Sequence, residues 1–123
     1  FLAKSGAEGM WSWTFQRPKD QPYDDFDGAS HKEQKDAMIT YPSFFMPTRS
    51  YPTLQWEGIR EGVDDYRYIH TLRVLASEAN RTDILDGLQR LLDEVPWNVR
   101  SLSAEEVEKV RARIVDWLLE IHE

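Results

Sequence analysis

The sequence contains no cysteine and only three histidines. Without cysteine the chain has no disulfide bond and no thiol nucleophile. A zinc site would have to use His31, His70 and His122, and these show no His-x-x-x-His spacing. We therefore predict no zinc site and no cofactor. The lack of cysteine does not fix the compartment, because a well-packed domain can be secreted without disulfides.

Positive charge is also scarce. The chain has 15 Lys and Arg against 22 Asp and Glu, a formal net charge of −7. A nucleic-acid partner would require a basic stripe, and an anionic membrane surface would repel this charge. No apolar run approaches the roughly 20 residues that span a bilayer. These absences argue against nucleic acid and membrane as partners.

What remains is the composition of a globular protein, with 41% hydrophobic and 30% charged residues in 123. That length suits one core, and the first residue, Phe1, gives the chain the look of a piece excised from a longer protein. Two parts differ in character. Residues 1–52 hold five of the six prolines, whereas residues 53–123 have helical periodicity.

An aromatic segment comes first. Gly9–Phe15 alternates large rings with small residues, which predicts a strand with Trp11, Trp13 and Phe15 on one face. A long loop follows to Pro52, within which Ala37–Tyr41 is predicted to be extended. The rings either fill a core or stack on the C–H faces of a sugar.

Three helices are predicted after the loop, so the fold class is mainly α. The first runs over residues 54–79 with Thr53 as its N-cap. The second covers residues 83–95 and ends at Pro96. The third begins at Ser103, which forms a capping box with Glu106.

The first helix carries glycines at positions 58 and 62. Each costs about 0.5–1 kcal/mol relative to alanine inside a helix, so we expect a neighbour to approach closely there. Its apolar arc is broad enough to predict contact with two neighbours. The arc contains Leu54, Gly58, Ile59, Gly62, Val63, Tyr66, Ile69, Leu72 and Ala76. Charges on the opposite face, such as Glu57 and Arg60, are expected to be solvated or paired with one another, and therefore structural.

An acidic cluster at residues 24–28 resembles part of a calcium loop. Its first ligand position is Tyr23 and its twelfth is Gln34, which supply no carboxylate. A solvated turn is the favoured interpretation.

The segment from Leu54 to Ile69 resembles a motif near the C-terminal end of the catalytic domain of glycoside hydrolase family 123 and its relatives of unknown function. The aromatic segment Gly9–Trp13 and the pair Tyr41–Pro42 precede it in the family's order. The motif residues of this helix are Glu57, Gly58, Arg60, Gly62, Asp65 and Tyr66. The resemblance implies the C-terminal portion of a (β/α)8 barrel, with the helix packed outside the sheet and Trp13, Phe15 and Tyr41 on the substrate side.

The family resembles retaining β-N-acetylgalactosaminidases in which the acetamido group of the substrate is the nucleophile. Their adjacent Asp-Glu pair lies on an earlier strand, and Asp93–Glu94 ends a helix instead. The resemblance thus implies that the chain supplies aromatic residues for an N-acetylhexosamine-containing glycan and no catalytic residue. It also implies an extracytoplasmic or secreted location if the parent enzyme acts on external glycans. A helical interaction or scaffold module without catalysis is the alternative.

Overall fold

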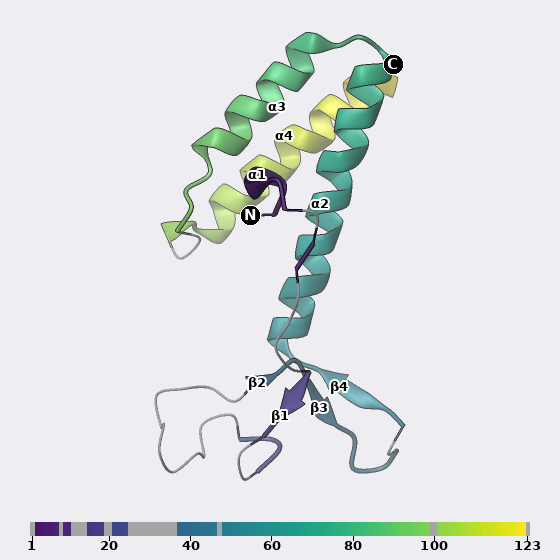
Figure 1. Cartoon of the computed structure of the whole chain (residues 1–123), viewed down its shortest axis with the longest axis vertical. Helices are drawn as coiled ribbons and strands as arrows, with labels where there is room; N and C mark the ends of the chain where they lie inside the picture. The colour runs from purple at the N-terminus through teal and green to yellow at the C-terminus, as the bar shows by residue number, and fades with distance from the viewer. Residues whose placement is uncertain are drawn as a thin grey trace. The chain divides into compact units, whose positions relative to one another are not determined.

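The structure, a computed structural model, describes residues 2–7, 9–10, 15–18, 21–24, 37–46, 48–98 and 101–122. In these ranges it contains four helices and four short strands (Figure 1). They are α1 (Leu2–Ser5), β1 (Gln16–Arg17), β2 (Ala37–Met38), β3 (Thr40–Pro42), β4 (Ser50–Pro52), α2 (Leu54–Glu78), α3 (Thr82–Glu94) and α4 (Ala104–His122). The chain is therefore mainly helical, as predicted.

The chain divides into two compact units, which are described separately. The helical unit takes in Phe1–Met10 and Val63–Glu123, and the strand unit takes in Trp11–Gly62. Helix α2 begins in the strand unit and ends in the helical unit. Among the described residues, no helix is long and apolar enough to cross a membrane.

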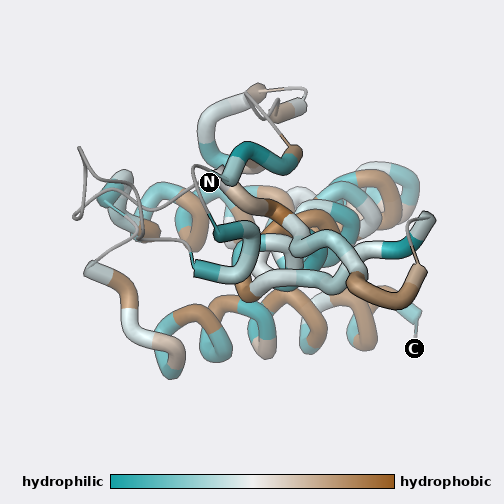
Figure 2. The backbone as a smooth tube through the Cα atoms, turned by 90° about the horizontal axis from the view of Figure 1, so that it is seen from below, coloured by the Kyte–Doolittle hydropathy of each residue, from teal (hydrophilic) through white to brown (hydrophobic). Residues whose placement is uncertain are grey.

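The core of the helical unit lies where α1, α3, α4 and the C-terminal half of α2 meet. Apolar residues recur along these helices between hydrophilic ones (Figure 2), which gives each helix one face to bury. Leu72, Ile84 and Leu88 are at most 1% exposed, and burying such a side chain contributes about 1.5–3 kcal/mol. The remaining buried members are Ala3, Ile69, Ala76, Leu92, Ile114 and Trp117.

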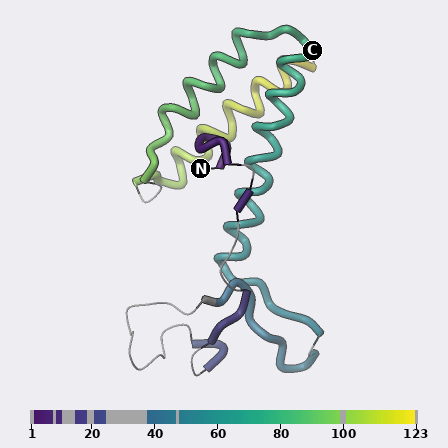
Figure 3. Tube along the Cα trace, viewed as in Figure 1, coloured from purple at the N-terminus to yellow at the C-terminus, as the bar shows by residue number. Residues whose placement is uncertain are grey.

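Helix α2 ends in a Schellman motif. Asn80 takes a left-handed conformation with φ of 55°. The Arg81 amide donates to the Ala76 carbonyl (2.8 Å) and the Asn80 amide donates to the Ser77 carbonyl (3.2 Å). Arg81 also pairs with Glu120 of α4 at 2.5 Å, and the C-terminus lies near this turn (Figure 3).

The predicted start of α4 is confirmed. The Ser103 amide donates to the Glu106 carboxylate (2.7 Å), and the Glu106 amide donates to Ser103 Oγ (3.2 Å). These reciprocal hydrogen bonds form the capping box. Because they stabilise the charged carboxylate, the pKa of Glu106 lies below its ordinary value.

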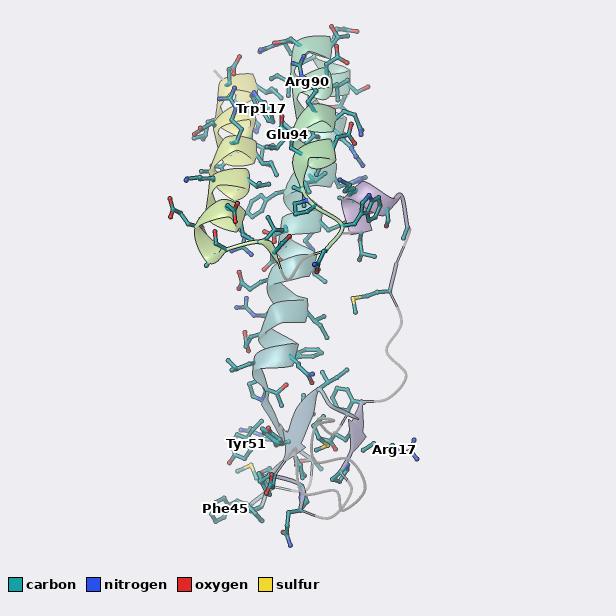
Figure 4. All side chains as sticks on the ribbon, turned by 90° about the vertical axis from the view of Figure 1, so that its left-hand side faces the viewer. Arg17, Phe45, Tyr51, Arg90, Glu94 and Trp117 are labelled. Atoms are coloured by element: carbon teal, nitrogen blue, oxygen red, sulfur yellow. The ribbon has the colours of Figure 1, made fainter. Side chains whose placement is uncertain are left out.

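Helices α3 and α4 approach closely at a glycine. Trp117 of α4 (Figure 4) lies against Gly87 of α3, where a Cβ would be 2.9 Å from the indole ring. Trp117 itself is 8% exposed. The missing side chain of Gly87 therefore makes room for the largest ring of the core.

The strand unit contains two antiparallel strand pairs. Strand β1 pairs with β2, and β3 pairs with β4 so that Tyr41 lies opposite Tyr51. Gln16 of β1 donates from Nε2 to the Thr40 hydroxyl of β3 (2.8 Å), which links the two pairs. Thr53 caps α2, since its Oγ1 accepts from the Trp56 amide (3.2 Å) and donates to the Ile39 carbonyl (2.5 Å).

Two sequence predictions require correction. The strand predicted over Gly9–Phe15 is wrong at the ends that the structure describes, because Gly9, Met10 and Phe15 are not in a strand and β1 begins at Gln16. Its central residues 11–14 lie outside the described residues. The extended segment predicted over Ala37–Tyr41 is confirmed as β2 and the start of β3.

The second correction concerns the first half of α2. No described atom lies within 4 Å of a Cβ placed at Gly58 or Gly62, so the expected close neighbour is not supplied by the described part of the chain. Leu54 is 91% exposed and Val63 is 40% exposed. The buried residues of α2 therefore begin at Ile69 and pack with α3 and α4, while Ile59 of the arc is half-buried.

Candidate functional site

Of the three residues predicted to contact a sugar, two can be located. Trp13 lies outside the described residues. Phe15 is 52% exposed, and its carbonyl accepts from the Ile39 amide (2.9 Å). Tyr41 is half-buried in the middle of β3. Both residues belong to the strand unit, but they lie in different aromatic groups.

Tyr41 belongs to a group of three rings with Tyr23 and Phe44, here called the aromatic platform. Tyr23 and Phe44 are stacked, with ring centroids 4.3 Å apart and an interplanar angle of 20°. The Tyr41 ring lies 5.7 Å from that of Tyr23, tilted by 35°. These separations fall in the range of favourable aromatic pairs. The three rings thus form one group of aromatic contacts centred on Tyr23.

The backbone holds the platform in place. Tyr41 is fixed by the β3–β4 ladder, in which it pairs with Tyr51. The Tyr23 hydroxyl donates to the carbonyl of Pro42, which directly follows Tyr41. In the hairpin turn, the Met46 amide donates to Ser43 Oγ (3.1 Å), which orders the segment carrying Phe44. The phenol of Tyr23 is therefore held against the strand at its polar end and against Phe44 at its face.

The platform is open to solvent. Phe44 is 77% exposed and Tyr23 is 38% exposed. Next to Phe44, Phe45 is 87% exposed and projects from the hairpin (Figure 4). Apolar rings are usually buried, so an exposed group of this kind indicates a contact surface.

Phe15 makes a separate aromatic pair. Its ring meets Trp56 of α2 edge-to-face, with centroids 6.4 Å apart and planes at 87°. Trp56 is 39% exposed. This pair fastens the chain before β1 to the first turn of α2.

The resemblance names Tyr41 as a substrate-side residue, but it does not name the other two rings of the platform, Tyr23 and Phe44. Phe44 lies only three residues beyond Tyr41 in the sequence, in the loop that joins β3 to β4. Tyr23 lies 18 residues before Tyr41 in a segment with no periodicity, and nothing in the sequence indicates which strand it contacts.

The motif residues of α2 make structural contacts. Arg60 pairs with Glu57 (2.8 Å) and Glu61 (2.7 Å), which confirms that charges on this face pair with one another. Asp65 pairs with Arg111 of α4 through two hydrogen bonds of 2.6 and 3.0 Å. The Asp65 carboxylate raises the pKa of the Arg111 guanidinium, so this side chain stays charged. Tyr66 is 37% exposed, and Gly58 and Gly62 are exposed.

The acidic groups named in the sequence analysis are the cluster at residues 24–28 and the pair Asp93–Glu94. Most of the cluster at residues 24–28 lies outside the described residues. Asp93 and Glu94 end α3, and Asp93 accepts from Gln89 Nε2 (3.0 Å). In the part of the chain that the structure describes, no group of three or more histidines and carboxylates is arranged to hold a metal ion. The chemistry that the platform offers is stacking on an apolar face.

Comparisons of the chain with protein-family models, with curated proteins and with solved structures find no match.

Proposed function

We propose that this chain is the C-terminal portion of a carbohydrate-active enzyme, similar to the retaining, substrate-assisted β-N-acetylgalactosaminidases that its sequence resembles. In this proposal its role is to bind sugar through aromatic rings. The observation that carries the proposal is the exposed platform of Tyr23, Tyr41 and Phe44. Tyr41, which the resemblance places on the substrate side, is part of it.

The physical argument rests on shape. A pyranose ring has an apolar C–H face, and an exposed aromatic face of similar size removes that apolar area from water on stacking. The stacked pair Tyr23–Phe44 is preorganised, because the Tyr23 hydroxyl is already bonded to the Pro42 carbonyl. Preorganisation lowers the entropy lost on binding.

The proposal also places this chain in a (β/α)8 barrel. In it, β3 and β4 belong to the sugar-binding end and α2 is a helix of the outer ring. The ion pairs on its polar face, such as Glu57–Arg60, support a structural role for the motif. The catalytic acid and the carboxylate that orients the acetamido group come from outside this chain.

Sugar binding can be tested by saturation-transfer NMR with N-acetylgalactosamine, using glucose as a sugar without an acetamido group. We expect N-acetylgalactosamine to bind and Phe44→Ala to weaken binding about tenfold, the equivalent of 1.4 kcal/mol. Phe45→Ala is the matched control, because Phe45 is a neighbouring exposed phenylalanine outside the platform. Equal losses in the two variants, or no signal from the wild type, would contradict the proposal.

Hydrolysis provides a separate test. The chain alone should not cleave a chromogenic N-acetylgalactosaminide, because no catalytic pair is assigned to it. Turnover above background that survives purification would show that the chain holds catalytic groups of its own.

The exposed apolar residues in the first half of α2 favour a second candidate, a helical interaction module. Leu54 is 91% exposed, and no described atom lies near a Cβ at Gly58 or Gly62. This candidate predicts concentration-dependent association in sedimentation velocity that Gly62→Glu abolishes, together with no sugar binding.

A further inference from the structure

The helical unit contains a cavity of about 380 Å³ that the proposed sugar surface does not use. It lies among α1, α2, α3, α4 and the segment that connects α3 to α4. An engineered apolar cavity of about 150 Å³ binds a benzene ring, and small-molecule sites are commonly about 300–1,000 Å³. The cavity is therefore large enough for a small organic molecule.

The walls of the cavity are mainly apolar. Buried residues Ile69, Leu92 and Ile114 line it together with the half-buried Val107 and Val110. Such walls favour an apolar body, because its transfer from water removes about 25 cal/mol for each Å² buried. They offer few hydrogen-bond partners to a sugar.

The charged residues of the lining carry a net charge whose sign is opposite to that of the whole chain. Lys4 and Arg111 are positive and Asp65 is negative, so two cations and one anion leave a net charge of +1 in a chain of −7. Arg111 is balanced by carboxylates: it forms two hydrogen bonds with Asp65 and an ion pair of 2.8 Å with Glu108 of its own helix. The unbalanced charge of the lining is therefore the ammonium group of Lys4.

The structure fixes the position of this ammonium. Lys4 Nζ donates to the Asp93 carbonyl (2.9 Å) and to the Val95 carbonyl, at the C-terminal end of α3. It also lies 5.0 Å from the centre of the Trp97 ring. A helix C-terminus stabilises a cation, and an ammonium has three N–H donors, of which these carbonyls use two.

We propose that this cavity binds a small monocarboxylic acid with an apolar body. The carboxylate faces Lys4, and the hydrocarbon part packs against Ile69, Val110 and Ile114. A charge-assisted hydrogen bond to the ammonium selects the carboxylate over a neutral or cationic head group.

The proposal is tested with three probes of equal chain length: octanoate, octanol and octylammonium. Each is titrated into the full chain below its aggregation limit and followed by chemical shifts of backbone amides. We expect octanoate to shift the amides of residues around Val110, octanol to bind at least tenfold more weakly, and octylammonium to leave the spectrum unchanged. Octanol binding as tightly as octanoate, or no binding by any probe, would overturn the proposal.

Two variants of α4 locate the site. Ala104 lines the cavity, whereas Ala112 does not, and both are exposed. Ala104→Trp should abolish octanoate binding, and Ala112→Trp should leave it within twofold of the wild type. Equal effects of the two variants would contradict this location.

A third variant tests the head group. Lys4→Gln should lower octanoate affinity to that of octanol and leave octanol affinity unchanged. Circular dichroism and a thermal melt check that each variant keeps its fold. The platform lies in the strand unit and the cavity in the helical unit. Failure of these tests would therefore not contradict sugar binding by Phe44, and failure of the sugar-binding test would not contradict the cavity proposal.

Discussion

The two halves of α2 differ in what covers them. In the second half, Leu72 and Ala76 are fully buried against α3 and α4. In the first half, Leu54 is 91% exposed and nothing described lies near Gly58 or Gly62. The apolar arc continues along the whole helix in the sequence, yet the buried residues of α2 all lie in its second half.

This difference shows that the same apolar arc can serve contacts within the chain or contacts with another surface. A periodic apolar arc indicates that a helix face is made for contact, but it does not say whether the contact lies within the chain. The second half of α2 contributes to the core of the helical unit, whereas the first half exposes apolar residues such as Leu54. In the proposed barrel, the surface that contacts these residues is the sheet.

The strongest test of this contrast replaces a leucine in each half. Leu72→Ala should lower the free energy of unfolding by about 2–5 kcal/mol, because it leaves a cavity in the core. Leu54→Ala should change it by less than about 0.5 kcal/mol, as expected for an exposed position. Urea denaturation followed by circular dichroism measures both. A large effect of Leu54→Ala would show that the first half is covered after all.

Glycines extend the contrast. At Gly87, a Cβ would lie 2.9 Å from the Trp117 ring, so Gly87→Ala should destabilise the chain by about 1–3 kcal/mol through overpacking. At Gly58 no described atom lies within 4 Å of the added methyl group, so Gly58→Ala should stabilise the chain by up to about 1 kcal/mol. Thermal melts of the two variants should therefore shift in opposite directions. Destabilisation by Gly58→Ala would reveal a close neighbour at that position.

Neighbouring carboxylates on α2 provide a third comparison. Asp65 bridges to Arg111 of α4, whereas Asp64 pairs with Arg67 one turn away on its own helix, where both side chains are largely exposed. Asp65→Asn should destabilise the helical unit by about 1–2 kcal/mol, and Asp64→Asn by less than about 0.5 kcal/mol. Denaturation midpoints decide the comparison. Equal shifts would mean that the bridge between helices contributes no more than a surface pair.

The helices were predictable because local signals define them. The arc of α2, the Thr53 cap and the Ser103–Glu106 capping box each depend on residues a few positions apart, and the structure has all three. The Schellman motif at Asn80, which the sequence analysis did not predict, depends on residues equally close together in the chain.

The rest depends on contacts that local patterns do not encode. The sequence places glycines at positions 58, 62 and 87 in helices, and only the packing of Trp117 shows that Gly87 needs its missing side chain. Likewise, Tyr41 was identified from the resemblance, but its neighbour Tyr23 lies in an irregular segment whose pairing no period predicts. The cavity beside Lys4 requires residues from four helices and from the segment between α3 and α4 to meet, so no single motif signals it.

The smallest expected effect is a difference between the N-caps of α2 and α4 in how their contribution to stability depends on pH. The cap of α2 is the neutral Thr53 hydroxyl, whereas that of α4 includes the Glu106 carboxylate, whose pKa the hydrogen bonds from Ser103 lower. A carboxyl group with a lowered pKa in the folded state adds stability above its ordinary pKa of 4.5, and this stability is lost as the pH falls through the lower folded value. Glu106→Gln should therefore lower the melting temperature at pH 7 and have little effect in strong acid. Thr53→Ala should lower the melting temperature by the same amount at both pH values, because a hydroxyl does not titrate in this range. A pH-independent effect of Glu106→Gln would mean that the stabilisation by Glu106 does not depend on its charge, and that the two helices begin by equivalent caps.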